Sequence, residues 1–317
     1  MKYQTELPFL SVSGAQVVID AALRTYLPRA SQGPVNGLNE AVEYSVFQGG
    51  KRIRALLVLM GAQVAKVIHP VRVLEAACAL EFVHASSLIL DDLPCMDNAE
   101  IRRGRPALHR AFGENTALLT ALALLNQAYA LFGKYPALMR EAAECIGVNG
   151  MIGGQYLDLQ PAGNPLCRLA DRNRKTSALM QLALTAGVLS SGAPATVAAA
   201  LGKTGRLLGE AYQILDDCLD AHAPSGETGK PPGQDLRHNR PSHAAGLSRV
   251  QCHAEVADLV EEAYCTLVQT FGPTRPVADL ITFARNMLRV SEVPRTASRP
   301  RRLFPQSTPG TKRVFAS

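Results

Sequence analysis

Residues 205–220, GRLLGEAYQILDDCLD, decide the fold class. Their apolar side chains recur with the 3.6-residue period of an α-helix and form one stripe. The stripe consists of Leu207, Leu208, Ala211, Ile214, Leu215, Cys218 and Leu219. A second face carries Gln213, Asp216, Asp217 and Asp220. Acids this close together destabilise a helix, and a merely solvated acidic face would normally be interleaved with Lys or Arg. A hard divalent cation would turn the repulsion into coordination.

A second acidic cluster lies at residues 91–98, DDLPCMDN. Asp91 and His84 fall on one face of an apolar helical pattern, and Asp92 follows directly. Pro94 cannot continue a helical hydrogen-bond ladder, so we expect the helix to kink or end there. The chain should then turn Asp97 back toward the pair.

Two acidic clusters on two otherwise apolar helices predict carboxylates that face each other across a cavity. Magnesium usually binds through one or two carboxylates, several waters and substrate phosphates. The pattern therefore favours a clamp for a diphosphate over a closed structural metal site.

Basic residues lie near both acidic clusters. Residues 49–54, GGKRIR, place three cations at the start of a helix, where backbone N–H groups also favour anions. Residues 102–105, RRGR, follow the first acidic cluster, and Lys175 and Lys230 lie in polar breaks. Each group alone is a common surface feature. Together with the acids they predict an anionic substrate, since Arg suits bidentate phosphate binding and Lys supplies a point charge.

Helical periodicity recurs along nearly the whole chain, and no convincing strand pattern interrupts it. We expect helices near residues 14–27, 37–48, 51–67, 71–93, 115–133, 136–148, 149–159, 166–190, 194–221, 250–271 and 275–290. Residues 224–233 are rich in Gly and Pro and predict a functional loop or lid. No linker divides the chain, so residues 1–292 are expected to form one all-α domain of about ten or more helices around a deep central cavity.

Composition narrows the remaining possibilities. The seven cysteines form no Cys-x-x-Cys pair, which favours free thiols in a reducing cytoplasm over disulfides or a zinc site. No segment predicts a signal peptide or stable membrane insertion. The formal charge of +6 is carried by the basic segment 293–317, for which we expect a disordered, solvated tail. Contact of this tail with RNA or an acidic membrane is the less favoured alternative, and we expect no nucleic-acid partner.

At this point the sequence resembles the trans-isoprenyl diphosphate synthases of the polyprenyl synthetase family, most closely the bacterial geranylgeranyl diphosphate synthases. GGKRIR, the helix of His84, DDLPCMDN with RRGRP, GGQYLDL, KTSAL, YQILDDCLD and TGKPPGQD follow the order of that family. They span about residues 49–235. The resemblance implies Mg²⁺-dependent head-to-tail condensation of isopentenyl diphosphate with dimethylallyl, geranyl or farnesyl diphosphate, carried out by a homodimer with the isoprenoid synthase fold.

The same resemblance implies roles for individual residues. Three Mg²⁺ ions, for which Mn²⁺ could substitute, would be held by Asp91, Asp92, Asp97, Asp216, Asp217 and Asp220. The allylic diphosphate would contact Arg102, Lys175, Thr176, Gln213 and Lys230. Isopentenyl diphosphate would bind Lys51, Arg52, His84 and Arg103 in a pocket without metal. The catalytic set would be Asp91, Asp92, Asp97, Lys175, Asp216 and Asp217, and the base that takes the proton in the last step would be the released diphosphate.

Product length should depend on what blocks the hydrocarbon pocket below Asp91. The fourth and fifth residues before it are Ser87 and Ser86, which are both small. In the family an aromatic residue at the fifth position goes with a fifteen-carbon product. The pair therefore predicts geranylgeranyl diphosphate, with farnesyl or longer diphosphates as alternatives. One departure from the family is that Arg240 stands near the place of a usual lysine after the second motif.

Three other functions fit parts of the pattern. A class I terpene cyclase shares the helical fold but would lack the isopentenyl diphosphate residues and the second aspartate cluster. A non-catalytic partner subunit would generally have lost one acidic cluster. A purely structural helical bundle explains neither cluster. The synthase is the only one of the four that uses all the motifs.

Overall fold

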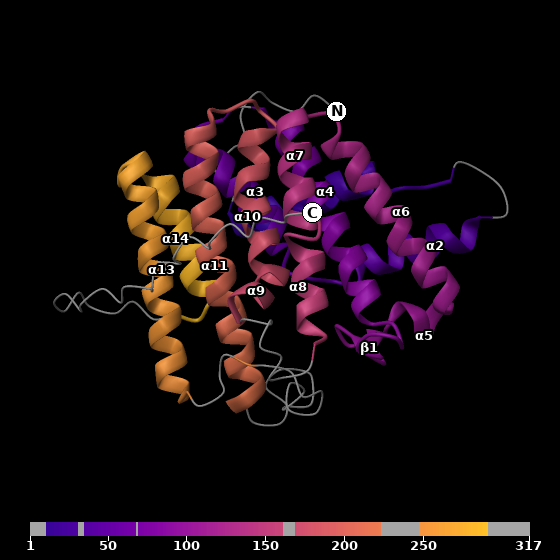
Figure 1. Ribbon diagram of the computed structural model, residues 1–317. Coiled ribbons are helices and arrows are strands. Elements are labelled where there is room, and N and C mark those ends of the chain that lie inside the picture. The colour runs from indigo at the N-terminus through magenta and orange to yellow at the C-terminus, as the bar shows by residue number, and fades with distance from the viewer. Residues whose placement is uncertain are drawn as a thin grey trace, which may run out of the picture.

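The computed structural model describes residues 11–30, 35–67, 69–160, 169–222, 242 and 247–290. The described chain is almost entirely helical, which confirms the all-α prediction (Figure 1). The first half contains α1 (Val12–Tyr26), α2 (Asn36–Phe47), α3 (Ile53–Val64), α4 (Pro70–Asp91), α5 (Leu108–Phe112), α6 (Glu114–Phe132) and α7 (Pro136–Ile146). The second half contains α8 (Met151–Asp158), α9 (Leu169–Arg172), α10 (Arg174–Leu189), α11 (Ala195–His222), α13 (Arg249–Phe271) and α14 (Arg275–Met287).

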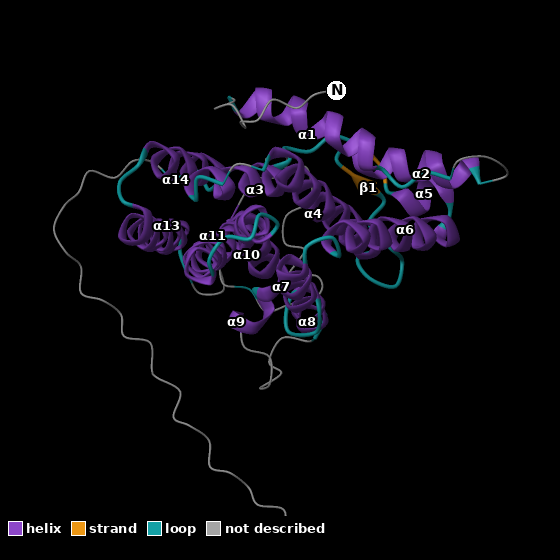
Figure 2. Cartoon of the chain, turned by 90° about the horizontal axis from the view of Figure 1, so that it is seen from above, coloured by secondary structure: helices purple, strands orange, loops and turns teal. Residues whose placement is uncertain are grey.

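Helix α10 lies at the centre of the bundle and packs against α3, α4, α7, α8 and α11 (Figures 1 and 2). Every residue from Ala178 to Val188 except Gln181 is buried. A helix that is apolar on all sides is stable only where neighbours cover it completely. The composition of α10 therefore makes it the centre of the core, and its first turn becomes a fixed reference point for the motifs around it.

Helix α4 carries the first acidic motif at its C-terminal end and is itself a core helix. It is the one described helix long and apolar enough to cross a membrane, but 72% of its most apolar window is buried inside the protein. Phe82 and Leu80 are fully buried. Its apolar composition is thus explained by packing against α3, α6 and α10.

Several elements differ from the prediction, and one of them is the short helix α5, which lies in none of the expected ranges. Residues Ile101–Arg102 (β1) and Arg105–Pro106 (β2) form a short antiparallel hairpin, in which Arg103 and Gly104 have φ angles of 52° and 76°. Positive φ at both central positions is typical of a type I′ turn. Strands of two residues are too short to give an alternating pattern, so the sequence does not reveal them. The expected helix 166–190 is described from residue 169, as α9 and α10.

Glu75, near the start of α4, is almost fully buried and accepts hydrogen bonds from neighbouring side chains. Lys134 Nζ donates to its Oε1 at 2.6 Å, and the Tyr135 hydroxyl donates to its Oε2 at 2.5 Å. Burial alone would raise the pKa of Glu75, but these hydrogen bonds outweigh burial and hold it below its ordinary value of 4.5. The ionised form of Glu75 is therefore the one that stabilises the fold.

We expect Glu75→Gln to lower the free energy of unfolding by about 1–3 kcal/mol at pH 7, because an amide cannot pair with the Lys134 ammonium. The difference from wild type should be complete above the unfolded-state pKa of 4.5 and should disappear as pH falls through the lower folded-state pKa. Urea denaturation at pH 7 and pH 3.5 measures it. Equal destabilisation at both pH values would contradict the electrostatic origin.

Candidate active site

The first acidic motif sits where α4 ends. Asp91 is the last residue of the helix, and Asp92 caps it. The chain then reverses, because the Asp97 N–H donates to the Asp91 carbonyl at 2.9 Å and the Asn98 N–H donates to the Leu93 carbonyl at 3.0 Å. The predicted end of the helix and the return of Asp97 toward the pair are both confirmed.

Two consecutive residues in the first turn of α10 connect to both acidic motifs. Lys175 Nζ lies 3.5 Å from Asp91 Oδ2 on α4. The Thr176 hydroxyl donates to Gln213 Oε1 on α11 at 2.9 Å, and Gln213 Nε2 donates to Asp217 Oδ1 at 2.8 Å. The two motifs, distant in sequence, therefore flank one helix N-terminus, where the backbone dipole also favours anions.

Lys175 has a second carboxylate partner that the sequence did not single out. Asp158, the last residue of α8, lies 3.3 Å from Lys175 Nζ through its Oδ2. Its Oδ1 accepts from Arg172 Nε at 2.9 Å and also from Arg172 Nη2. Both Asp158 and Arg172 are buried. The sequence signal for Asp158 is its place in the GGQYLDL motif, but the motif does not reveal its partners, which come from α9 and α10.

The close approach of α8 to α10 depends on Gly154. A methyl group at this position would lie 2.1 Å from the backbone nitrogen of Lys175. No real Cβ is found so close to a backbone atom, so only glycine permits this packing. The glycine of the GGQ motif thus positions the lysine that faces Asp91.

The charges around Lys175 fix its protonation state. Burial would lower the pKa of Lys175, but Asp91 and Asp158 outweigh burial and raise it. The ammonium group is therefore retained at neutral pH. Burial raises the pKa of Asp91, and the nearby charge of Asp97 adds to this effect although Lys175 opposes it. The Asp91 carboxylate accordingly lies in a site that favours further positive charge.

The resemblance of these motifs implies Mg²⁺, and the donor set here fits that ion in one particular way. The candidate ligands are carboxylates, the hard oxygen donors that Mg²⁺ prefers. Within the described residues, no three His, Cys, Asp or Glu side chains are close enough to form a metal site by themselves. The described aspartates thus suit ions shared with a substrate diphosphate rather than an all-protein cage. Asp216 is exposed, Asp220 is half-buried and Asp217 is buried.

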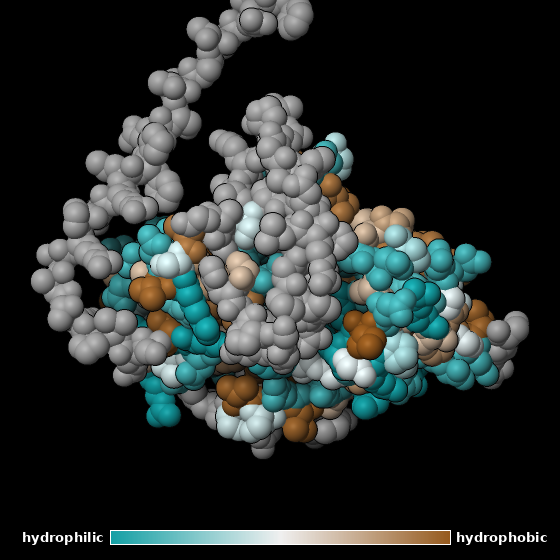
Figure 3. Space-filling view, turned by 90° about the horizontal axis from the view of Figure 1, so that it is seen from below, coloured by the Kyte–Doolittle hydropathy of each residue, from teal (hydrophilic) through white to brown (hydrophobic). Residues whose placement is uncertain are grey.

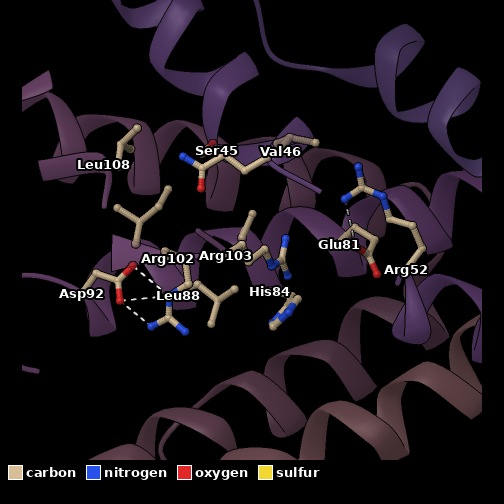
Figure 4. A pocket seen from close by; sticks show the side chains of 13 residues that line it. Ser45, Val46, Arg52, Glu81, His84, Leu88, Asp92, Arg102, Arg103 and Leu108 are labelled. Carbon is tan, nitrogen blue, oxygen red and sulfur yellow. Dashed lines mark hydrogen bonds and ion pairs between the residues drawn. The ribbon is translucent and has the colours of Figure 1, made fainter. Parts of the chain in front are cut away.

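A pocket opens between the end of α2, α4 and the β-hairpin (Figure 4). It is lined by Arg52, His84 and Arg103, three of the four residues expected to bind isopentenyl diphosphate, together with Arg102, Glu81 and Asp92. Lys51 is exposed and does not line it. The two acids in the pocket are already paired, Glu81 with Arg52 and Asp92 with Arg102 (Figure 4). The pocket therefore retains a positive character.

His84 is neutral and carries its proton on one identifiable nitrogen. Burial, followed by the charge of Arg54, lowers the pKa of His84 well below its ordinary value. Arg54 Nη1 lies 3.1 Å from His84 Nε2. A guanidinium only donates, so Nε2 must be the acceptor and the proton lies on Nδ1. His84 Nδ1 and Arg54 Nε are both buried without a described partner, which leaves two donors for an anion.

Arg52 and Arg54, two residues apart in GGKRIR, have different environments. The guanidinium of Arg52 is 7% exposed and lies between Asp20 and Glu81, at 2.8 Å and 3.6 Å. Its charge is therefore already balanced. Arg54, which has no place in the predicted site, contacts His84 instead. The sequence signal for Arg54 is its place in the GGKRIR motif, two residues after Arg52.

Arg102 and Arg103 diverge at the turn of the hairpin. Arg102 Nε donates to both carboxylate oxygens of Asp92 at 3.0 Å, and its Nη2 donates to Oδ1. Arg103 donates to the Gly49 carbonyl. Arg102 therefore braces the first acidic motif, whereas Arg103 joins the hairpin to the glycine loop before α3.

The two predicted chain-length residues lie on different sides of α4. Ser86 is buried and its hydroxyl donates to the Ala121 carbonyl of α6 at 2.9 Å. Ser87 is partly buried and donates to the His84 carbonyl of its own helix at 3.0 Å. Ser86 thus faces the α4–α6 interface, where added bulk would have to displace α6 or enter the space beside it. Lys230, Arg240 and the tail 293–317 lie outside the described residues.

Seen from below, the described surface on both flanks is mainly hydrophilic, with single hydrophobic residues among the hydrophilic ones (Figure 3). The elements that carry Lys175, Asp91 and Asp217 converge toward the end of the bundle near the hairpin (Figure 1).

Comparison with known proteins identifies a family. Residues 35–269, well over half of the chain, match the polyprenyl synthetase family. The farnesyl diphosphate synthase of Geobacillus stearothermophilus is 36% identical over 259 residues, which cover 77% of this chain and 86% of that enzyme. The geranylgeranyl diphosphate synthase of Pseudescherichia vulneris is 34% identical over 253 residues, covering 76% of this chain and 82% of that enzyme.

A solved structure extends the agreement to the fold. The geranyltransferase of Legionella pneumophila superimposes with a TM-score of 0.72 at 27% identity, covering 88% of this chain and 98% of that chain. The family match, the sequence similarity and the similarity of fold each cover well over half of the chain. The chain therefore belongs to the polyprenyl synthetase family, the prenyltransferases that condense isopentenyl diphosphate head to tail with allylic diphosphates.

Proposed function

We propose that this prenyltransferase makes geranylgeranyl diphosphate at the site between α4, α10 and α11. One observation carries the assignment of the site. Lys175 and Thr176, adjacent in the first turn of α10, contact the first acidic motif and the Gln213–Asp217 pair of the second. An allylic diphosphate placed at this N-terminus would meet the ammonium group, the helix dipole and carboxylates of both motifs.

The difficult step is cleavage of the allylic C–O bond, which leaves a carbocation and a free diphosphate. Mg²⁺ bound with the diphosphate would supply Lewis-acid stabilisation of the charge on the departing oxygens. Lys175 stays protonated beside this charge because of Asp91 and Asp158. Thr176 and Gln213, held by their mutual hydrogen bond, connect this position to the second acidic motif. Asp91, Asp92, Asp97, Asp216, Asp217 and Asp220 are the carboxylates we assign to metal binding.

Isopentenyl diphosphate is assigned to the pocket around His84. The two unpartnered donors, His84 Nδ1 and Arg54 Nε, support an anionic ligand there. We therefore assign this substrate to Arg54, His84 and Arg103, with Lys51 reaching it from the surface. Arg52 pairs with Asp20 and Glu81, so its charge is already balanced, and we assign it a structural role in the pocket. The released allylic diphosphate is the base that takes the proton after the new C–C bond forms, so no side chain is assigned to that step.

The product is assigned as twenty carbons because Ser86 and Ser87, the residues expected to limit the length of the chain, are both small. We expect Ser86→Tyr to shorten the main product from about twenty to about fifteen carbons, since an aromatic ring spans more than one 5.4 Å helical turn of pocket. Incubation with labelled isopentenyl diphosphate, an allylic primer and Mg²⁺, followed by chromatography, measures the product. Ser86→Ala is the matched control, because it removes the hydrogen bond to Ala121 without adding bulk. An unchanged product in Ser86→Tyr, or a shortened one in Ser86→Ala, would refute this pocket assignment.

We also propose that the enzyme is a homodimer. Helix α6 exposes an apolar stripe of Leu118, Leu119 and Leu122, which are 43%, 56% and 61% exposed. Apolar stripes of this kind on a core helix are typical of a covered surface. Sedimentation should give twice the chain mass of 33.9 kDa, and Leu119→Glu with Leu122→Glu should shift it to the monomer. A wild-type monomer would exclude the proposal.

A reducing compartment, the cytoplasm, is proposed for the enzyme. The six described cysteines are free thiols, and four of them are buried. Disulfides would be expected to form between suitably placed cysteines in an oxidising compartment.

A further inference from the structure

The loop before α3 has a backbone conformation that requires outside support. Gly49, Gly50 and Arg52 have φ angles of 96°, 125° and 50°. Left-handed backbone is sterically unfavourable for a residue with a side chain such as Arg52, and it persists only where surrounding contacts fix it. This loop carries Lys51 and leads directly into Arg54. The placement of both cations thus depends on what holds the loop.

Helix α1 supplies two of the contacts. Gln16 Nε2 donates to the Lys51 carbonyl at 3.0 Å, and Arg52 Nε donates to Asp20 Oδ1 at 2.8 Å. Gln16 and Asp20 are four residues apart and therefore lie on one face of the helix. Figure 2 shows α1 along the edge of the bundle, and it contacts both α3 and α4. Neither side chain lines the pocket around His84.

Glu81 of α4 completes the support from the opposite side. Its Oε2 lies 3.6 Å from Arg52 Nη1, and its Oε1 accepts from the Ala55 N–H in the first turn of α3 at 3.2 Å. Arg52 is therefore held between two acids from two helices. This arrangement fixes its left-handed backbone and orients the first turn of α3, where Arg54 meets His84.

We propose that α1 is a positioning element for the isopentenyl diphosphate pocket, acting through Gln16 and Asp20 on the loop of residues 49–52. These side chains touch no substrate. They hold Lys51 and Arg54 where the diphosphate binds, and without them the loop relaxes toward right-handed conformations. The inference rests on the proposed function of the pocket. Helix α1 precedes residues 35–269, the part of the chain that matches the family.

The test compares the two substrates in the full chain. Asp20→Asn should raise KM for isopentenyl diphosphate about fivefold by weakening a charge-assisted hydrogen bond, with KM for the allylic diphosphate unchanged. Gln16→Ala should act in the same direction, and Asp20→Glu should restore most of the affinity. Glu43→Gln is the matched control, because Glu43 pairs with Arg24 and Arg29 on the surface and does not touch the loop. Titration calorimetry with isopentenyl diphosphate and EDTA gives a readout independent of turnover.

If α1 has a purely structural role, Asp20→Asn and Gln16→Ala should lower the melting temperature or raise both KM values together. Either result, without a selective rise in KM for isopentenyl diphosphate, would overturn the inference. An unchanged affinity for isopentenyl diphosphate in both Asp20→Asn and Gln16→Ala would also overturn it. Failure of the proposed function is separate, since it would show as absence of condensation by the wild-type protein and of isopentenyl diphosphate binding in the calorimeter.

Discussion

Asp91→Asn should lower kcat for condensation by about 10²–10³-fold, the range found when one preorganised electrostatic contact to a developing charge is removed. The amide keeps the size of the side chain but loses the charge that faces Lys175 at 3.5 Å. KM for isopentenyl diphosphate should stay within about twofold, because that substrate is assigned to a different pocket. The Mg²⁺ concentration needed for half-maximal rate should rise. Steady-state assays over a range of Mg²⁺ concentrations measure all three quantities.

The melting temperature of Asp91→Asn shows whether Asp91 serves the reaction or the stability of the fold. Burial raises the pKa of Asp91 above its unfolded-state value, so the charged form destabilises the fold at neutral pH. Asp91→Asn should therefore melt no lower than wild type. Asp279→Asn is the matched control, since Asp279 is half-exposed and pairs only loosely with Arg275 at 3.7 Å. Retention of more than about a tenth of kcat in Asp91→Asn would remove this carboxylate from the catalytic set.

Gly154→Ala should damage both stability and turnover. The added methyl group would lie 2.1 Å from the Lys175 nitrogen, so α8 or the first turn of α10 must move. Overpacking of this kind costs about 1–3 kcal/mol in the free energy of unfolding. A displacement of about 1 Å at Lys175 should lower kcat about a hundredfold, because misplaced groups lose their alignment with the reacting atoms.

Gly37→Ala provides the control for this substitution. Gly37 lies in α2 with nothing within 4 Å of the added methyl group, and it does not have a positive φ. Since alanine is the better helix former, this control should be neutral or slightly stabilising. Urea denaturation and steady-state kinetics on both variants test the prediction. Wild-type kinetics in Gly154→Ala would show that the packing of α8 on α10 does not position Lys175.

The helices were predictable from the sequence because their burial depends on local periodicity. The stripe of residues 205–220 lies in α11 as expected, and its members Leu208, Ala211, Ile214, Leu215 and Cys218 are buried. Pro94 also marks the turn after α4 correctly. In both cases the deciding interactions are between residues close in sequence, which is why spacing alone reveals them.

The parts that could not be predicted depend on contacts between distant segments or on backbone angles. Asp158 is recognisable as important only once α10 brings Lys175 to it. Arg52 and Arg54 differ in environment because Arg52 has a left-handed backbone that turns its side chain toward Asp20, whereas Arg54 is already helical. Nothing in the letters GGKRIR distinguishes these two arginines, since the difference is produced by α1 and α4.

The adjacency of Lys175 and Thr176 has a consequence for how this protein can vary. Successive residues of an α-helix are rotated by about 100° around its axis, so these two neighbours contact elements on different sides of α10. Inserting or deleting a single residue within this turn would rotate one of them away from its partner, and no side-chain exchange could repair the loss. Insertions and deletions should therefore be tolerated in the connections around α10 but not within its first turn. A chimera of this enzyme and a relative should accordingly be joined outside that turn.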